Sequence, residues 1–189
     1  MTDYTRADLE QALDALSDNT LAATEFEIAR AVVIAATLAN KTIATGESLT
    51  AGLIASTLAT VPGASRVLRG GVIAYASDLK SSGLNVPASI IDRGGVIQAP
   101  VAGAMAVGAR AWANADFGLA CTGVAGPDEQ DGHPVGEVHV AVAGPTEGAV
   151  RTHSLTLAGD RDGIRHGTVL VVLGMVLDAL LPIVGLTRE

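Results

Sequence analysis

Alternating strand-like and helical runs restrict the fold of this 189-residue chain more than any other feature. A short β-rich run over residues 42–45 leads at once into a helical run over 50–60. Two later strand-like runs, 137–143 and 150–157, are separated by residues 144–148, a loop short enough for a hairpin. Helices between early strands and an antiparallel pair at the end predict an α/β domain. We expect a three-layer α/β/α sandwich with a mixed, mostly parallel sheet of about five strands.

The remaining apolar runs complete this prediction. Helices are expected over residues 5–16, 25–40, 77–83, 87–92, 100–113 and 159–181, and strands over residues 67–76 and 117–121. The chain is long enough for one domain with a sizeable core. Residues 1–24 are predicted to form an N-terminal helical extension, and residues 25–189 the main domain.

Composition excludes several classes of partner. The net charge is −8 and no basic stripe is present, so no nucleic-acid partner is expected. The single cysteine, Cys121, cannot form an internal disulfide and is compatible with a reducing cytoplasm. The N-terminus lacks a signal-peptide pattern. The apolar stretch 169–186 is interrupted by Gly174, Asp178 and Pro182, which favours a buried helix over a membrane span. We therefore expect a cytoplasmic protein with no membrane partner.

Ser48 stands where the first strand-like run meets the next helical run. A serine hydroxyl becomes an effective nucleophile when a base takes its proton, and Lys80 is the candidate base because no histidine lies near either residue in the sequence. Lys80 would need burial to lower its pKa. Tyr75 would relay the proton or hold the lysine, and backbone N–H groups near Leu49 or Thr50 would stabilise an oxyanion. Taken alone, these residues also fit an N-cap serine and a packing tyrosine, which are the commoner roles of such residues.

A second group of candidate residues lies in the C-terminal half. The Gly-rich turn 122–127 follows a buried strand, so its N–H groups are suited to cradle a phosphate. Arg161 and Arg165 are four residues apart at a helix start and would reach the same anion. Ordinary turn chemistry and solvated charges at a helix end also account for this pattern.

The cysteine and histidines do not predict a metal site. Cys121 is expected to be a core residue at a strand end. His133, His139, His153 and His166 lack metal-ligand spacing, and no CxxC or HExxH motif occurs. We therefore predict no structural metal.

The segment Glu47-Ser48-Leu49-Thr50-Ala51-Gly52 resembles the E-S-C-T-G-G signature of the CinA C-terminal domain family, the PncC-type nicotinamide-nucleotide amidohydrolases or NMN deamidases. The resemblance covers about residues 25–181. Further matches follow in order at residues 61–65, 69–75, 80, 104–106, 122–127, 134–136, 159–161 and 165.

This resemblance implies an activity and a set of site residues. Family members hydrolyse the carboxamide of nicotinamide mononucleotide to nicotinic acid mononucleotide and ammonia, within a three-layer α/β/α fold. The family's catalytic serine, tyrosine and lysine correspond to Ser48, Tyr75 and Lys80. The expected substrate-binding residues are Glu47, Thr50, Thr122, Gly123, Gly126, Arg161 and Arg165. No cofactor is implied, the partner is a small-molecule nucleotide, and a homo-oligomer in a stand-alone form without the amino-terminal CinA domain is expected.

The chain departs from the family pattern at several positions. Leu49 replaces a cysteine and Ala51 a glycine of the signature, residues 97–98 are Ile-Gln where Val-Ser is usual, and the loop 128–131 is more acidic. Acidic groups near a phosphate weaken its binding. These departures keep two alternatives open: a catalytically inactive nucleotide-binding relative that acts through a partner, and an amidase for another small amide.

Overall fold

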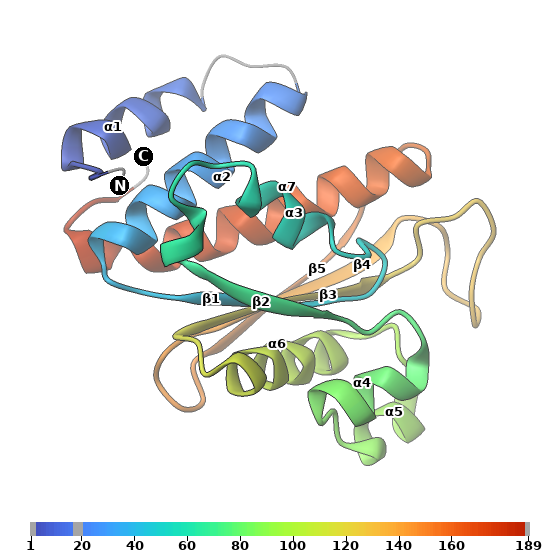
Figure 1. Ribbon diagram of the computed structural model, residues 1–189. Helices are drawn as coiled ribbons and strands as arrows, with labels where there is room; N and C mark the ends of the chain where they lie inside the picture. Colours follow the sequence, from blue (N-terminus) through green and yellow to red (C-terminus); the bar gives the residue numbers. More distant parts are fainter. Residues whose placement is uncertain (1–2, 17–20, 188–189) are drawn as a thin grey trace.

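The computed structural model describes residues 3–16 and 21–187 as three layers with a sheet at the centre (Figure 1). One face of the sheet is covered by α1 (Arg6–Ala15), α2 (Leu21–Leu38), α3 (Leu53–Ala59) and α7 (Arg161–Leu180). The other face carries α4 (Ser77–Leu84), α5 (Ala88–Gly94) and α6 (Ala99–Ala113). Two short 3-10 helices, η1 (Ala64–Arg66) and η2 (Leu181–Val184), complete the described elements.

The sheet has five strands in the order β2-β1-β3-β4-β5. Their bounds are β1 (Ile43–Glu47), β2 (Leu68–Ile73), β3 (Phe117–Gly123), β4 (Glu137–Ala143) and β5 (Val150–Thr156). β1 pairs in parallel with both β2 and β3, whereas β3 with β4 and β4 with β5 are antiparallel. Only β4 therefore runs against the other strands. This confirms the predicted three-layer fold with a mixed, mostly parallel sheet.

The two sides of the sheet have cores of different composition. The side beneath α2 and α7 is built from branched residues such as Val138 and Val140 of β4. The side beneath α6 is built largely from alanine, including Ala120 and Ala141. Small side chains let α6 lie close to the sheet, and close packing of this kind makes interiors sensitive to any added atom.

Gly108 of α6 illustrates this sensitivity, because a Cβ there would overlap the carbonyl oxygen of Leu84. Gly108→Ala is expected to lower the free energy of unfolding by about 1–3 kcal/mol. Gly103 lies on the same helix, and a Cβ there would make ordinary contacts of 3.4 Å with Val150 and Thr152. Gly103→Ala is the matched control and should change stability by less than about 1 kcal/mol. Urea denaturation of both variants checks this, and equal stability losses would contradict it.

Two predicted helix starts differ from the structure. α3 begins at Leu53 rather than near residue 50, because Ala51 and Gly52 adopt left-handed backbone conformations with φ of 51° and 95°. α2 begins at Leu21, so the predicted boundary between residues 24 and 25 lies inside a helix. Residues 17–20, which follow the first predicted helix, lie outside the described residues.

The helix before that boundary is packed on the domain. Leu9 and Ala12 of α1 are fully buried and belong to the same core as α2 and α7. Their burial stabilises the fold through the apolar area that they remove from water. The described part of the predicted N-terminal extension thus packs in the helical layer that contains α2 and α7.

The stretch Arg161–Val184, which contains α7, is long and apolar enough by length and composition to cross a membrane. The core helix of a globular domain meets the same criteria. In this fold Val169, Leu173 and Leu177 are fully buried, facing the same core as β3 and β4. One face of α7 is therefore buried, as predicted for the apolar stretch 169–186, whereas Ile183 beyond the end of the helix is exposed.

Candidate active site

Ser48 and Lys80 meet although they come from different elements. Ser48 directly follows β1, and α4 carries Lys80 beneath it. The Nζ atom of Lys80 lies 3.1 Å from Ser48 Oγ and 2.9 Å from the carbonyl oxygen of Ala74. Lys80 is only 1% exposed, and this burial lowers its pKa from the ordinary value of 10.5, an effect partly opposed by Cys121. The burial that the base role requires is therefore present.

Glu47 holds the turn that follows Ser48. Its carboxylate is 1% exposed and accepts hydrogen bonds from the N–H groups of Gly52, Ile54 and Ala55 at 2.9–3.0 Å. The hydroxyl of Thr50 donates to the same carboxylate at 2.8 Å. A carboxylate at this position satisfies the free N–H groups at the start of α3. Glu47 and Thr50 were expected to bind substrate, but the structure uses their polar groups within the turn.

Cys121 of β3 lies under the same turn. Its Sγ is 3.0 Å from the Thr50 hydroxyl and accepts hydrogen bonds from the backbone N–H groups of Ser48 and Thr50. Burial, with the charge of Glu47 nearby, raises the pKa of the Cys121 thiol to about 11. Cys121 is thus a core residue, as predicted. Because the Thr50 N–H is directed at sulfur, Leu49 is left as the expected oxyanion donor.

A polar cavity of about 130 Å³ opens above Ser48 and Lys80. Tyr75 lies on its wall, half exposed, and its hydroxyl accepts a hydrogen bond from Arg161 Nη2 at 2.7 Å. Arg161 Nη1 also donates to the carbonyl of Gly126 at 2.6 Å. The expectation that Tyr75 contacts the lysine is therefore corrected. Its hydroxyl instead contacts Arg161, another residue of the cavity wall.

The Gly-rich turn after β3 forms another wall of the cavity. Thr122 is buried and donates its hydroxyl proton to the carbonyl of Val96 at 2.8 Å. Gly126 has a left-handed φ of 85°, and a Cβ there would collide with Val135. Gly123, with φ of 155°, lines the cavity beside it. The structure therefore brings Thr122, Gly123 and Gly126 to the site, as expected.

Arg165 does not line the cavity. Its Nε donates to the carbonyl of Leu49 at 3.1 Å, and its Nη2 donates to the carbonyl of Thr50 at 2.9 Å. Its Nη1 lies 3.5 Å from the Asp162 carboxylate. The expected joint clamp of Arg161 and Arg165 on one anion is corrected, because the two side chains end at different places.

The cavity wall includes polar residues that the sequence did not single out as site residues, namely Ser77, Asp128 and Gln130. Ser77 precedes Lys80 by three residues on α4, and this helical spacing could have placed it beside the lysine. Asp128 and Gln130 belong to the acidic loop that departs from the family pattern. Residues 97–98 also depart from the family pattern. Ile97 lines the cavity, whereas Gln98 donates to the backbone carbonyls of Ile90 and Gly95.

Within residues 3–16 and 21–187, no group of three or more His, Cys, Asp or Glu side chains is arranged to hold a metal ion. The nearest arrangement is a hydrogen-bonded cluster at the start of β4. His133 Nδ1 and His139 Nε2 lie 3.0 and 3.1 Å from the same Glu137 oxygen. His139 Nδ1 also contacts the Ser154 hydroxyl at 2.8 Å. The histidines there are engaged with a carboxylate and a hydroxyl.

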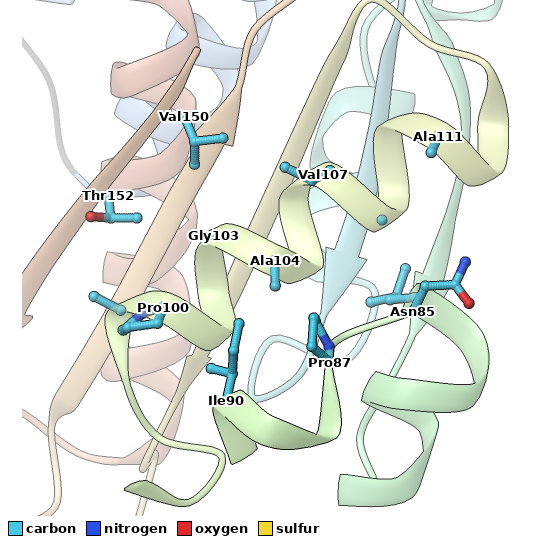
Figure 2. Close-up of a pocket in the computed structure, with 13 residues that line it drawn as sticks. Asn85, Pro87, Ile90, Pro100, Gly103, Ala104, Val107, Ala111, Val150 and Thr152 are labelled. Atoms are coloured by element: carbon cyan, nitrogen blue, oxygen red, sulfur yellow. The ribbon is translucent and has the colours of Figure 1, made fainter. Parts of the chain in front are cut away.

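A larger cavity of about 580 Å³ lies between α6, β5 and the start of α5 (Figure 2). Its wall is formed mainly by apolar residues such as Ile90, Ala104, Val107 and Val150. No acidic, basic, histidine or cysteine side chain is among its lining residues. The candidate active site is therefore the smaller polar cavity, which carries Ser48 and the buried Lys80.

Comparison with known proteins identifies the family. The model of the CinA C-terminal domain matches residues 25–180. A CinA-like protein of Frankia casuarinae is 45% identical over 135 residues, which are 71% of this chain and 31% of that protein. The chain thus spans about a third of the length of the curated relatives that it matches.

Solved structures agree with this result. The competence/damage inducible protein CihA of Agrobacterium tumefaciens is 34% identical with a TM-score of 0.78, covering 82% of this chain and 94% of that one. The competence damage-inducible protein A of Klebsiella pneumoniae is 27% identical with a TM-score of 0.77, covering 82% and 96%. From the family match, the sequence identity and the shared fold, the chain belongs to the CinA C-terminal domain family.

Proposed function

We propose that this chain is an amidohydrolase that converts nicotinamide mononucleotide into nicotinic acid mononucleotide and ammonia. The observation that carries the proposal is the pairing of Ser48 Oγ with the buried Nζ of Lys80 at 3.1 Å, at the floor of a polar cavity. Membership of the CinA C-terminal domain family supports it. A serine beside a lysine of lowered pKa is suited to nucleophilic attack on an amide.

The reaction would proceed in two stages. Neutral Lys80 accepts the hydroxyl proton of Ser48 as Oγ attacks the amide carbon, and the carbonyl oxygen becomes an oxyanion. The C–N bond then breaks, ammonia leaves with a proton from the Lys80 ammonium, and an ester remains on Ser48. In the second stage Lys80 takes a proton from water, the hydroxide attacks the ester, and the acid product leaves as Ser48 regains its proton.

The size and charge of the cavity suggest how a nucleotide would lie. About 130 Å³ is small beside the roughly 300–1,000 Å³ of typical ligand pockets. The ring and its carboxamide would fill the cavity, and the ribose and phosphate would lie at its mouth. Arg161 and Tyr75 lie on the wall there and would face the phosphate. Asp128, on the same wall, would repel it and reduce affinity.

Ammonia release from purified protein incubated with nicotinamide mononucleotide tests this proposal directly. The expected result is release of one ammonia for each nicotinic acid mononucleotide formed. Calorimetry that shows nucleotide binding without any hydrolysis over hours would instead support the inactive, partner-dependent relative. A panel of small amides, including free nicotinamide, separates the proposed substrate from another amide.

Arg161→Met is expected to raise the KM for the nucleotide by about tenfold or more with a smaller change in kcat, because a charge-assisted contact to the phosphate is lost. Hydrolysis of an amide without a phosphate should be affected less. Arg151→Met is the matched control, since Arg151 donates to the Met175 carbonyl far from the cavity. Steady-state kinetics measure both variants. An unchanged KM in Arg161→Met would contradict the assigned contact.

A further inference from the structure

The side chain of Arg165 ends on the turn that carries the candidate nucleophile. It makes two hydrogen bonds to consecutive carbonyls, those of Leu49 and Thr50, directly after Ser48. These contacts join segments 115 and 116 residues apart in the chain, so α7 reaches across to the end of β1. The side chain is 25% exposed, which leaves the contacts only partly screened by solvent.

Arg165 and Cys121 hold the same peptide unit from opposite sides. In a planar trans peptide the carbonyl of one residue and the N–H of the next point in opposite directions. The Leu49 carbonyl points to Arg165, and the Thr50 N–H accordingly points to Cys121 Sγ. The orientation of the Leu49–Thr50 peptide is therefore fixed from both sides.

The turn has an intrinsic reason to need such support. Ala51 and Gly52 both have left-handed backbone conformations, which are unfavourable for a residue with a Cβ such as Ala51. Glu47 satisfies the N–H groups of this turn, and Arg165 satisfies two of its carbonyls. A strained conformation persists only where the surrounding contacts over-determine it.

We propose that Arg165 is a positioning residue that holds the Ser48 turn in the conformation that keeps Oγ against Lys80 Nζ. The consequence for catalysis rests on the proposed function, because it assumes that Ser48 is the nucleophile. All three guanidinium nitrogens have partners in the protein, namely Leu49, Thr50 and Asp162. Arg165 also does not line the cavity, so its contacts lie with the turn and not with a ligand in the cavity.

Amide hydrogen exchange of Arg165→Met tests the proposal without any substrate. Exchange of the peptide covering residues 48–55 is expected to be faster by about tenfold or more, since the turn loses two hydrogen bonds to a charged group. Arg165→Lys keeps the charge but has a single donor nitrogen in place of the planar guanidinium, and it should give an intermediate rate. If Arg165→Met does not fold, the lysine variant provides the test. Arg151→Met, which also loses an arginine–carbonyl bond, should leave this peptide unchanged.

Two further measurements test whether the contacts of Arg165 with the Ser48 turn affect catalysis. Modification of Ser48 by phenylmethylsulfonyl fluoride, followed by mass spectrometry, should be slower in Arg165→Met by about tenfold, because positioning of reacting groups controls such rates. The kcat should fall while KM stays within a few-fold, in contrast to Arg161→Met.

The possible outcomes distinguish a failure of the positioning role of Arg165 from a failure of the proposed function. If exchange in residues 48–55 is unchanged in Arg165→Met, the positioning role of Arg165 is wrong. A raised KM with unchanged kcat in this variant would also overturn it, because that result indicates a substrate contact. Faster exchange with unchanged Ser48 modification would overturn the link between Arg165 and the nucleophile. If the wild-type protein releases no ammonia, only the proposed function is overturned, because amide hydrogen exchange still tests the positioning role of Arg165.

Discussion

Ser48→Ala is expected to reduce ammonia release from nicotinamide mononucleotide by at least about 10³-fold, because no acyl intermediate can form without the hydroxyl. The fold should be retained. Ser48 Oγ accepts one hydrogen bond from Lys80, and Lys80 keeps its other partner, the Ala74 carbonyl. Nucleotide affinity measured by calorimetry should therefore change little while turnover is lost.

The matched control for this variant is Ser56→Ala. Ser56 is an exposed serine on α3, eight residues further along the chain, and it does not line the cavity. An alanine there is a better helix former, so activity and stability should both be retained. If Ser48→Ala turned over the nucleotide at the wild-type rate, the nucleophile assignment would be wrong. Equal losses in both variants would indicate a general effect on the fold.

The strands and most helices could be predicted because their apolar runs are short and bounded by Gly, Pro or Asn. Residues 144–148, for example, were expected to separate two strands, and β4 and β5 are paired antiparallel on either side. The start of α3 could not be predicted in this way. A left-handed Ala51 has no sequence signal, since the residue is a good helix former.

Within the candidate site, Ser48 and Lys80 could be paired from residue type and the family resemblance, but the way in which the fold brings them together could not be predicted. The 3.1 Å distance depends on the parallel pairing of β1 with β2, which brings α4 beneath the end of β1. Similarly, Tyr75 and Arg161 are 86 residues apart in the chain. Residue types indicate what groups are able to do, whereas such long-range contacts are determined by how helices and strands pack.

The same limit explains why Arg165 and Glu47 were assigned to substrate binding. Charged residues near a catalytic motif are candidates for ligand contacts on residue type alone. In the fold, each is engaged with the backbone of the Ser48 turn. A turn with two left-handed residues requires partners for both its N–H groups and its carbonyls, and the sequence does not say which side chains supply them.

Lys80→Met is expected to lower kcat/KM by about 10³-fold, because the group that accepts the Ser48 proton is removed. In the wild type, kcat/KM should rise with pH through the lowered pKa of Lys80, since only the neutral amine acts as a base. Methionine has a similar length and suits a site that is 1% exposed. A residual activity with the same acid limb would show that another group is the base.

The stability of Lys80→Met should depend on pH in a defined direction. Burial lowers the pKa of Lys80 in the folded protein, while the unfolded chain keeps a value near 10.5. Between these two pKa values the unfolded wild type binds more protons than the folded one, so its free energy of unfolding rises with pH. The variant lacks this group. In urea denaturation across about pH 7–10, the free energy of unfolding of the wild type should therefore rise relative to that of Lys80→Met. If the difference between the two proteins does not change with pH, burial does not lower the pKa of Lys80.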